Sequence, residues 1–242
     1  MVEKYDLIFS LGSVPIVAQM LKQMELQIFD FPFDKISGGS FLTRMSLFLL
    51  DCANFMEQKN ISVQKNTPRE GITTYKDLKT GFVYLYDFNP DLLLENNFPS
   101  VKLKYDRYIK NLRLTVNAAK KILLLYVEDP QNKEDDEDNM SLVLEATQKL
   151  KNKYPNKNFK ILYVKNTEDI ENMKVIQIAN NAEKFEFNFY RQFSEMSSKY
   201  IDASILSTVL TDIELKKSWR QKKLFFYQKL LNKVLEFRAG LK

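Results

Sequence analysis

The 242-residue sequence contains no histidine and only one cysteine, Cys52. The missing histidine excludes Ser-His and Cys-His nucleophile activation, histidine general bases and every zinc site that needs an imidazole ligand. Acid–base chemistry would therefore fall to carboxylates, lysine, tyrosine or an activated water molecule. Aspartate and glutamate could still hold a hard cation, but we expect no metal ion and no cofactor.

The sequence also has no apolar run approaching the ~18–20 residues that a membrane span needs. The first residues lead directly into an apolar strand pattern, which leaves no room for a signal peptide. A single cysteine excludes an internal disulfide and suits a reducing compartment. We therefore expect a cytoplasmic location.

The net charge of +5 is unevenly distributed. Residues 216–242 carry nine basic side chains and one acid, so the other 215 residues sum to −3 and no nucleic-acid partner is expected. In this tail, apolar residues at helical spacing predict a helix packed against the body. The alternative is an interfacial membrane helix or a site for an anionic partner. The apolar stripe is formed by Trp219, Phe226, Leu230, Val234 and Phe237.

Apolar runs alternate with amphipathic segments along the chain and predict an α/β fold. We expect a largely parallel central sheet with helices on both faces, in a Rossmann-like layered arrangement, and a helical C-terminus. One domain should span residues 1–242, with the sheet core at about 5–190 and C-terminal helices at about 193–242. Strands are expected at 7–9, 28–34, 82–88, 122–127, 159–164 and 175–178, and helices after Ser13 and at 40–58, 101–119 and 141–153. Residues 60–80 should form a loop with a short hairpin around Gly71.

Polar groups follow several of the expected strands. In an open parallel sheet, ligands bind beyond the carboxyl ends of the strands, so these groups could line one pocket with backbone N–H donors from the first turn. The alternative is that Ser13 caps the first helix and the aspartates only terminate strands. The turn lacks the further glycines of the dinucleotide fingerprint and the Gly-Lys of the P-loop. The groups are the turn Ser10–Ser13 with Gly12, Asp30 with Asp34, Asp87, and Glu128 with Asp129.

Two other features have simpler interpretations. Cys52 lies within the helix expected at 40–58, near its apolar face, and without any histidine it is interpreted as a core thiol. The acid-rich stretch 128–139 is interpreted as a solvated loop.

Several blocks in order resemble the uncharacterised bacterial proteins described as putative papain-like cysteine peptidases. The blocks are YDLIFSLGS, FDFPFDKI, LYDF, KYDRYIKNLR and ILLLYVED, spread over roughly Tyr5 to Val164. The resemblance implies an Asn-Cys pair at the positions of Val14 and Pro15, and a histidine at that of Tyr86. Because a thiol peptidase needs a thiolate and a base, the chain is expected not to be a working cysteine peptidase.

Two functional classes remain. The chain could bind a protein partner or a glycan precursor without turnover, in line with the surface-polysaccharide setting that the resemblance implies. Alternatively, it could be a transferase or hydrolase acting on a glycan or sugar nucleotide through Asp30, Asp34 or Asp87. The candidate ligand-binding residues are Ser10, Gly12, Ser13, Asp30, Asp34, Tyr86 and Asp87, of which Asp34 and Asp87 are also the catalytic candidates.

Overall fold

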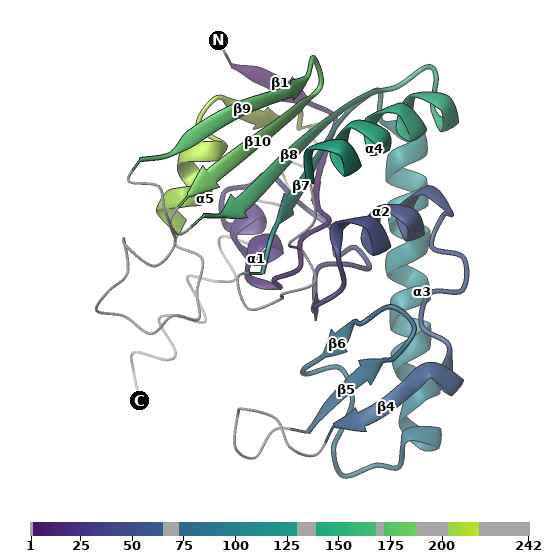
Figure 1. Cartoon of the computed structure of the whole chain (residues 1–242). Coiled ribbons are helices and arrows are strands. Elements are labelled where there is room, and N and C mark those ends of the chain that lie inside the picture. The colour runs from purple at the N-terminus through teal and green to yellow at the C-terminus, as the bar shows by residue number, and fades with distance from the viewer. Residues whose placement is uncertain (1, 65–72, 130–138, 168–171, 188–202, 218–242) are drawn as a thin grey trace, which may run out of the picture.

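The main sheet of the computed structural model has five strands in the order β2-β7-β8-β10-β9 (Figure 1). The structure describes residues 2–64, 73–129, 139–167, 172–187 and 203–217. Strands β2, β7, β8 and β10 are mutually parallel, whereas β9 runs antiparallel to β10. Their bounds are β2 Leu7–Ser10, β7 Lys121–Val127, β8 Asn158–Asn166, β9 Lys174–Ala179 and β10 Ala182–Phe187. A mixed α/β fold with a partly parallel sheet is therefore confirmed.

The interior strand β7 is buried on both of its faces, as its unbroken apolar run predicts. Ile122, Leu124 and Tyr126 belong to one core cluster, and the alternate residues Leu123, Leu125 and Val127 belong to another. Successive side chains of a strand point to opposite faces, so the two clusters lie on opposite sides of the sheet.

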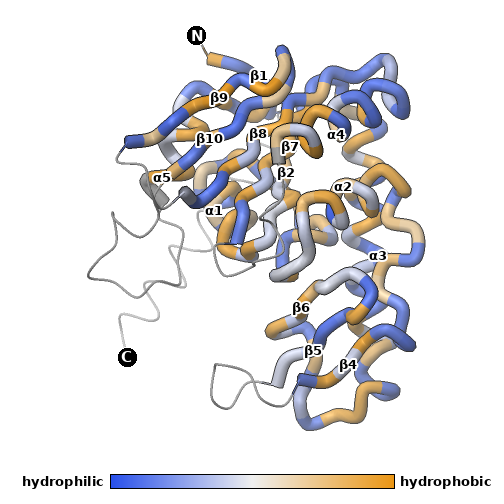
Figure 2. The backbone as a smooth tube through the Cα atoms, viewed as in Figure 1, coloured by the Kyte–Doolittle hydropathy of each residue, from blue (hydrophilic) through white to orange (hydrophobic). Residues whose placement is uncertain are grey.

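Helices contribute to both clusters. α1 (Ile16–Gln23) and α5 (Ala203–Val209) belong to the cluster around Leu123, and α2 (Phe41–Leu49), α3 (Leu94–Ala118) and α4 (Asn139–Lys153) to the cluster around Ile122. Hydrophobic and hydrophilic residues alternate along α3 (Figure 2), as expected for a helix buried on one side. None of the described helices combines the length and apolarity that a membrane crossing requires.

A second, antiparallel sheet was not expected. Its order is β3-β6-β5-β4, and it lies beside the N-terminal half of α3 (Figure 1). Its strands are β3 Ile36–Ser37, β4 Ile61–Gln64, β5 Thr74–Asp77 and β6 Val83–Tyr84, with a 3₁₀ turn at Gln58–Asn60 before β4. Strands β4 and β5 form the expected hairpin, whose tip at 65–72 lies outside the described residues.

Aromatic side chains join this second sheet to the core. The rings of Tyr84 and Tyr105 meet edge to face at 5.6 Å, and Tyr75 stacks on Phe88 at 4.3 Å. Two successive glycines make the sharp entry into α2, since Gly39 has a φ of +70° and a Cβ there would lie 2.3 Å from the Phe82 ring.

The helix expected at 40–58 begins as predicted but ends at Leu49. Ser40 caps it, accepting a hydrogen bond from the Thr43 N–H at 3.1 Å. At the other end, Lys153 donates to the Leu49 carbonyl and Arg113 to the Asp51 carbonyl. These distant cations stabilise terminal carbonyls, and Cys52 consequently lies in a turn with a φ of +56° rather than within a helix.

Other boundaries also differ. The strand expected at 82–88 is only Val83–Tyr84, and α3 begins at Leu94 rather than at residue 101. The segment expected to be extended at 28–34 instead enters a turn, in which the Asp34 N–H donates to the Phe31 carbonyl. Strand β10 was not among the expected strands, the last of which was expected at 175–178.

The chain end is not wholly helical. After α5 comes β11 (Ile213–Leu215), which pairs in parallel with β1 (Glu3–Tyr5). Lys216 then pairs with Asp6, and Lys217 with Glu25, so both bind the body of the protein. The expected helix and its apolar stripe in 219–242 lie outside the described residues.

Candidate functional site

The turn after β2 uses its backbone donors within the fold. The N–H groups of Leu11 and Ser13 donate to the carbonyls of Leu125 and Val127, and that of Gly12 to Ser10 Oγ. The alternative that Ser13 caps α1 was wrong, because its Oγ donates to the Val127 carbonyl at 2.8 Å and Pro15 occupies the N-cap position. The turn is therefore held against β7 by its own polar groups.

Arg44 holds the same turn from the side of α2. Its side chain is fully buried, and its guanidinium donates to the Leu11 carbonyl at 2.9 Å. It also donates to the carbonyls of Ile36, Gly38 and Gly39 and lies over the Phe82 ring at 4.9 Å. Arg44 thus ties the turn to the entry of α2.

Asp34 is the most deeply buried acid of the predicted set. Its side chain lies in the connection between α1 and β3, and the residue is 3% exposed. Its Oδ2 accepts hydrogen bonds from Gln27 Nε2 at 2.6 Å and from the Phe31 N–H at 2.8 Å, while Lys22 Nζ lies 3.8 Å away. Within the described part of the chain, Asp34 Oδ1 and Gln27 Oε1 are buried and accept no hydrogen bond.

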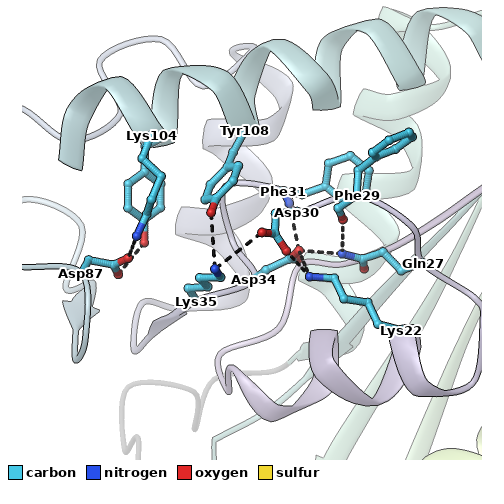
Figure 3. Close-up of polar contacts among 11 residues, drawn as sticks. Lys22, Gln27, Phe29, Asp30, Phe31, Asp34, Lys35, Asp87, Lys104 and Tyr108 are labelled. Atoms are coloured by element: carbon cyan, nitrogen blue, oxygen red, sulfur yellow. Dashed lines mark hydrogen bonds and ion pairs between the residues drawn. The ribbon is translucent and has the colours of Figure 1, made fainter. Parts of the chain in front are cut away.

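Asp30 lies beside Asp34 at the surface and is bracketed by cations (Figure 3). It pairs with Lys22, and its Oδ2 lies 3.5 Å from Lys35 Nζ. Lys35 in turn donates to the Tyr108 hydroxyl of α3 at 3.4 Å. We call Lys22, Gln27, Asp30, Asp34 and Lys35 the Asp34 centre.

Asp87 forms a neighbouring group on the same face of α3. It pairs with Lys104 and accepts a hydrogen bond from the Tyr105 hydroxyl at 2.8 Å. The rings of Tyr105 and Tyr108 meet edge to face at 5.6 Å. α3 therefore links Asp87 to the Asp34 centre, and Figure 3 shows Lys104 and Tyr108 extending from this helix toward the two acidic groups.

The structure thus brings together only part of the predicted site. Asp30, Asp34 and Asp87 are connected through α3, but no hydrogen bond or ion pair between described residues joins them to the Ser10–Ser13 turn. Neither Asp30 nor Asp34 follows a strand, and Asp87 follows the antiparallel β6. At the carboxyl ends of the parallel strands, the turn lies instead beside Val127 and Glu128.

The remaining candidate residues do not belong to the Asp34 centre. Tyr86 is 73% exposed, and Glu128 is buried, with its N–H donating to the Val164 carbonyl at 2.9 Å. The rest of the acid-rich loop, from 130 to 138, lies outside the described residues. Cys52 is buried as expected of a core thiol, and burial raises its thiol pKa to about 12.

The electrostatic state of the Asp34 centre follows from its burial. Desolvation raises the pKa of Asp34 to about 7, although Lys22 and the Phe31 N–H favour its charged form. The pKa of Asp30 is lowered, because its bonds to Lys22 and Lys35 outweigh its own desolvation. Two adjacent carboxyls therefore differ in protonation near neutral pH. Among the described residues, no group of three or more acids or thiols is arranged to hold a metal ion.

Sequence reasoning missed most partners of these acids. Lys104, Tyr105 and Tyr108 could have been found, because Lys104 and Tyr105 each stand one helical turn before Tyr108 in KYDRYIKNLR. No sequence signal marks Gln27, Lys22 or Arg44, since their roles depend on contacts made only in the folded chain.

Comparison with protein families matches the chain to the family described as "Putative papain-like cysteine peptidase", over residues 6–169. The match covers about two-thirds of the chain and includes the turn, the Asp34 centre and Asp87. It confirms the resemblance drawn from the sequence blocks. Comparison with curated proteins and with solved structures gives no match.

Proposed function

The chain belongs to the putative papain-like cysteine peptidase family, and from this premise we propose that it is a binding protein without cysteine-peptidase activity. One observation carries the proposal: Cys52, the only thiol, is 4% exposed, its pKa is raised to about 12, and the chain has no histidine. Peptidase chemistry of this class needs an accessible thiolate and a base that generates it. Pro15 and Tyr86 are proposed to stand where the family has its nucleophile and base.

The Asp34 centre is the proposed binding site. Lys22, Asp30 and Lys35 have half-exposed side chains, at 32%, 31% and 46%, so they can exchange partners with a ligand at little desolvation cost. Phe29 beside them is 40% exposed and offers an apolar surface. A carboxylate flanked by ammonium groups and an aromatic ring can pair with hydroxyls and cover a sugar ring. A glycan precursor or sugar nucleotide is therefore the proposed ligand, in line with a role in surface-polysaccharide biosynthesis.

Peptidase activity is tested first, with the purified chain and casein under reducing conditions, before and after iodoacetamide treatment. We expect no hydrolysis above a heat-inactivated blank. Thiol-dependent hydrolysis would overturn the proposal.

Binding is tested by calorimetric titration with a panel of uridine-diphosphate sugars. Asp30→Asn should weaken the binding of any sugar that binds by about tenfold, the loss of one charge-assisted hydrogen bond. The control is Asp106→Asn, which removes a more exposed acid that is likewise paired with a lysine, Lys102 on α3, and it should leave affinity unchanged. If no sugar binds, and a protein partner binds the wild type but not Asp30→Asn, the glycan assignment is wrong and the partner alternative stands.

A transferase or hydrolase is the second candidate, and the raised pKa of Asp34 supports it. A carboxyl with a pKa of about 7 is matched to proton transfer at neutral pH. However, Asp34 is 3% exposed and Asp87 is held by Lys104 and Tyr105, so neither meets a substrate without local opening. Release of a nucleotide from a uridine-diphosphate sugar by the wild type, lost in Asp34→Asn, would replace the binding-only function with this one.

A further inference from the structure

A cavity of about 490 Å³ lies where α2, α3 and α4 meet, on a part of α3 that the Asp34 centre does not use. Its volume is in the range of small-molecule sites. Apolar side chains from α2 and α3 form one part of it, and the turn after α2 and the end of α4 form the other. Its lining includes Phe48, Leu112, Val116, Asp51, Arg113 and Lys153.

The polar side of this cavity carries an excess of positive charge. Lys153 Nζ binds Asp51 Oδ1 at 2.6 Å, and Tyr154 donates to the same oxygen at 3.3 Å. Arg113 binds only the Asp51 carbonyl, through Nε at 3.0 Å and through Nη2. The Asp51 carboxylate therefore pairs with Lys153 alone, so two cations stand against one carboxylate at this cavity, and Arg113 Nη1 has no protein acceptor in the described part of the chain.

The apolar side is contributed by core residues. Phe48, Leu112 and Val116 are each 2–3% exposed, so the cavity reaches the edge of the main core cluster. An apolar group lying there would contact only the edges that these side chains expose, and the burial of its own apolar surface is favourable at roughly 25 cal/mol per Å².

We propose that this cavity binds an amphipathic monoanion, with an acyl or aromatic group against Phe48, Leu112 and Val116 and a carboxylate or phosphate at Arg113 and Lys153. Guanidinium groups bind such oxyanions through paired N–H donors, and Arg113 presents its free Nη1 at the rim. A cationic ligand would be repelled by the two like charges of Arg113 and Lys153, and a neutral ligand would form no ion pair with the excess positive charge. This site is independent of the one proposed at the Asp34 centre.

The test is calorimetric titration with sodium decanoate, decyl phosphate and decanol, each below its self-association concentration. Decanoate or decyl phosphate should bind with one-to-one stoichiometry, and decanol at least about tenfold more weakly, the value of one charge-assisted contact. Arg113→Met should weaken anion binding by about tenfold. Arg107→Met is the matched control, since Arg107 is exposed on α3 and does not line the cavity, and it should bind as the wild type does.

A second variant keeps the proposal testable if Arg113 also supports the turn. Asn117 is exposed at the cavity, so Asn117→Trp should block it without disturbing the core, whereas Asn111→Trp, exposed elsewhere on α3, should not. Asp30→Asn should leave decanoate affinity unchanged, which separates this site from the Asp34 centre. No binding of either anion, or equal binding by the wild type, Arg113→Met and Asn117→Trp, would overturn the proposal.

Discussion

The Ser10–Ser13 turn and the Asp34 centre are both polar groups next to an apolar core, and the turn and the two aspartates of that centre were selected from the sequence as parts of one site. In the turn, the N–H groups of Leu11, Gly12 and Ser13 all donate to acceptors of the same chain. In the Asp34 centre, two buried oxygens, Asp34 Oδ1 and Gln27 Oε1, accept no hydrogen bond from the described residues.

This difference separates polar groups that build the fold from groups that can act. A donor already bonded in the fold gains little from a ligand, because binding would only exchange one hydrogen bond for another. A buried acceptor without a donor costs free energy, and half-exposed charges such as Lys35 can be rearranged cheaply. The polar groups of the turn therefore serve the fold, and the Asp34 centre is the part that we propose to bind a ligand.

The largest expected effect comes from removing the arginine that holds the turn. Arg44→Met should lower the free energy of unfolding by about 3–5 kcal/mol, because buried carbonyls, including that of Leu11, lose their donor. Urea unfolding followed by circular dichroism measures the loss. Arg107→Met, at an exposed position, should change stability by less than about 0.5 kcal/mol.

A loss of less than about 1 kcal/mol in Arg44→Met would contradict the comparison, since the turn would then not depend on buried polar contacts. Arg44→Lys should fall between the wild type and Arg44→Met, because one ammonium cannot reach all the carbonyls that the guanidinium fork reaches.

The second prediction concerns the pH dependence that Asp34 imposes on stability. Burial raises the pKa of Asp34 from an ordinary 3.8 to about 7, so between these values the folded chain holds a proton that the unfolded chain has lost. Its contribution is therefore fully present below about pH 4 and is lost as the pH rises through about 7. Asp34→Asn cannot titrate, so the stability of the wild type relative to this variant should fall by about 2–4 kcal/mol from pH 4 to pH 8.

Urea unfolding at each pH unit from 4 to 8 measures this difference. Asp106→Asn, which removes an exposed acid, serves as the control and should run nearly parallel to the wild type. If the stability of Asp34→Asn also followed that of the wild type from pH 4 to pH 8, Asp34 would keep its charge in the folded state. The Asp34 centre would then not differ from the turn in holding an unusually protonated group.

The parts of the fold that could be predicted are those encoded by local pattern. Strands β7 and β8 were expected from their apolar residues, and the run of β7 is unbroken, as suits a strand buried on both faces. The start of α2 at residue 40 was also expected, and Ser40 is a good N-cap. The end of α2 could not be predicted, since Arg113 and Lys153, far along the chain, stabilise the carbonyls that end it.

The same limit applies to the candidate site. Asp30, Asp34 and Asp87 were selected because each was expected to follow a strand, yet two of them follow no strand. Their connection runs through Tyr108 and Lys104 of α3, and the buried state of Asp34 depends on Gln27. Residue type predicts which side chains can carry charge, whereas tertiary contacts decide their protonation and partners.

The smallest expected effect tests whether the turn is as tightly packed as its hydrogen bonds indicate. A Cβ added at Gly12 would lie 2.8 Å from Ser10 Oγ, the acceptor of the Gly12 N–H. Gly12→Ala should therefore destabilise the chain by about 1–2 kcal/mol, the cost of a modest overpacking. In a Ser10→Ala background the obstructing oxygen is gone, so the same change should cost less than about 0.5 kcal/mol. Thermal and urea unfolding of the four proteins of this double-mutant cycle measure the coupling. If the two substitutions had additive effects on the free energy of unfolding, the turn would accommodate the extra methyl group without a clash. Its packing would then be no tighter than that of the Asp34 centre.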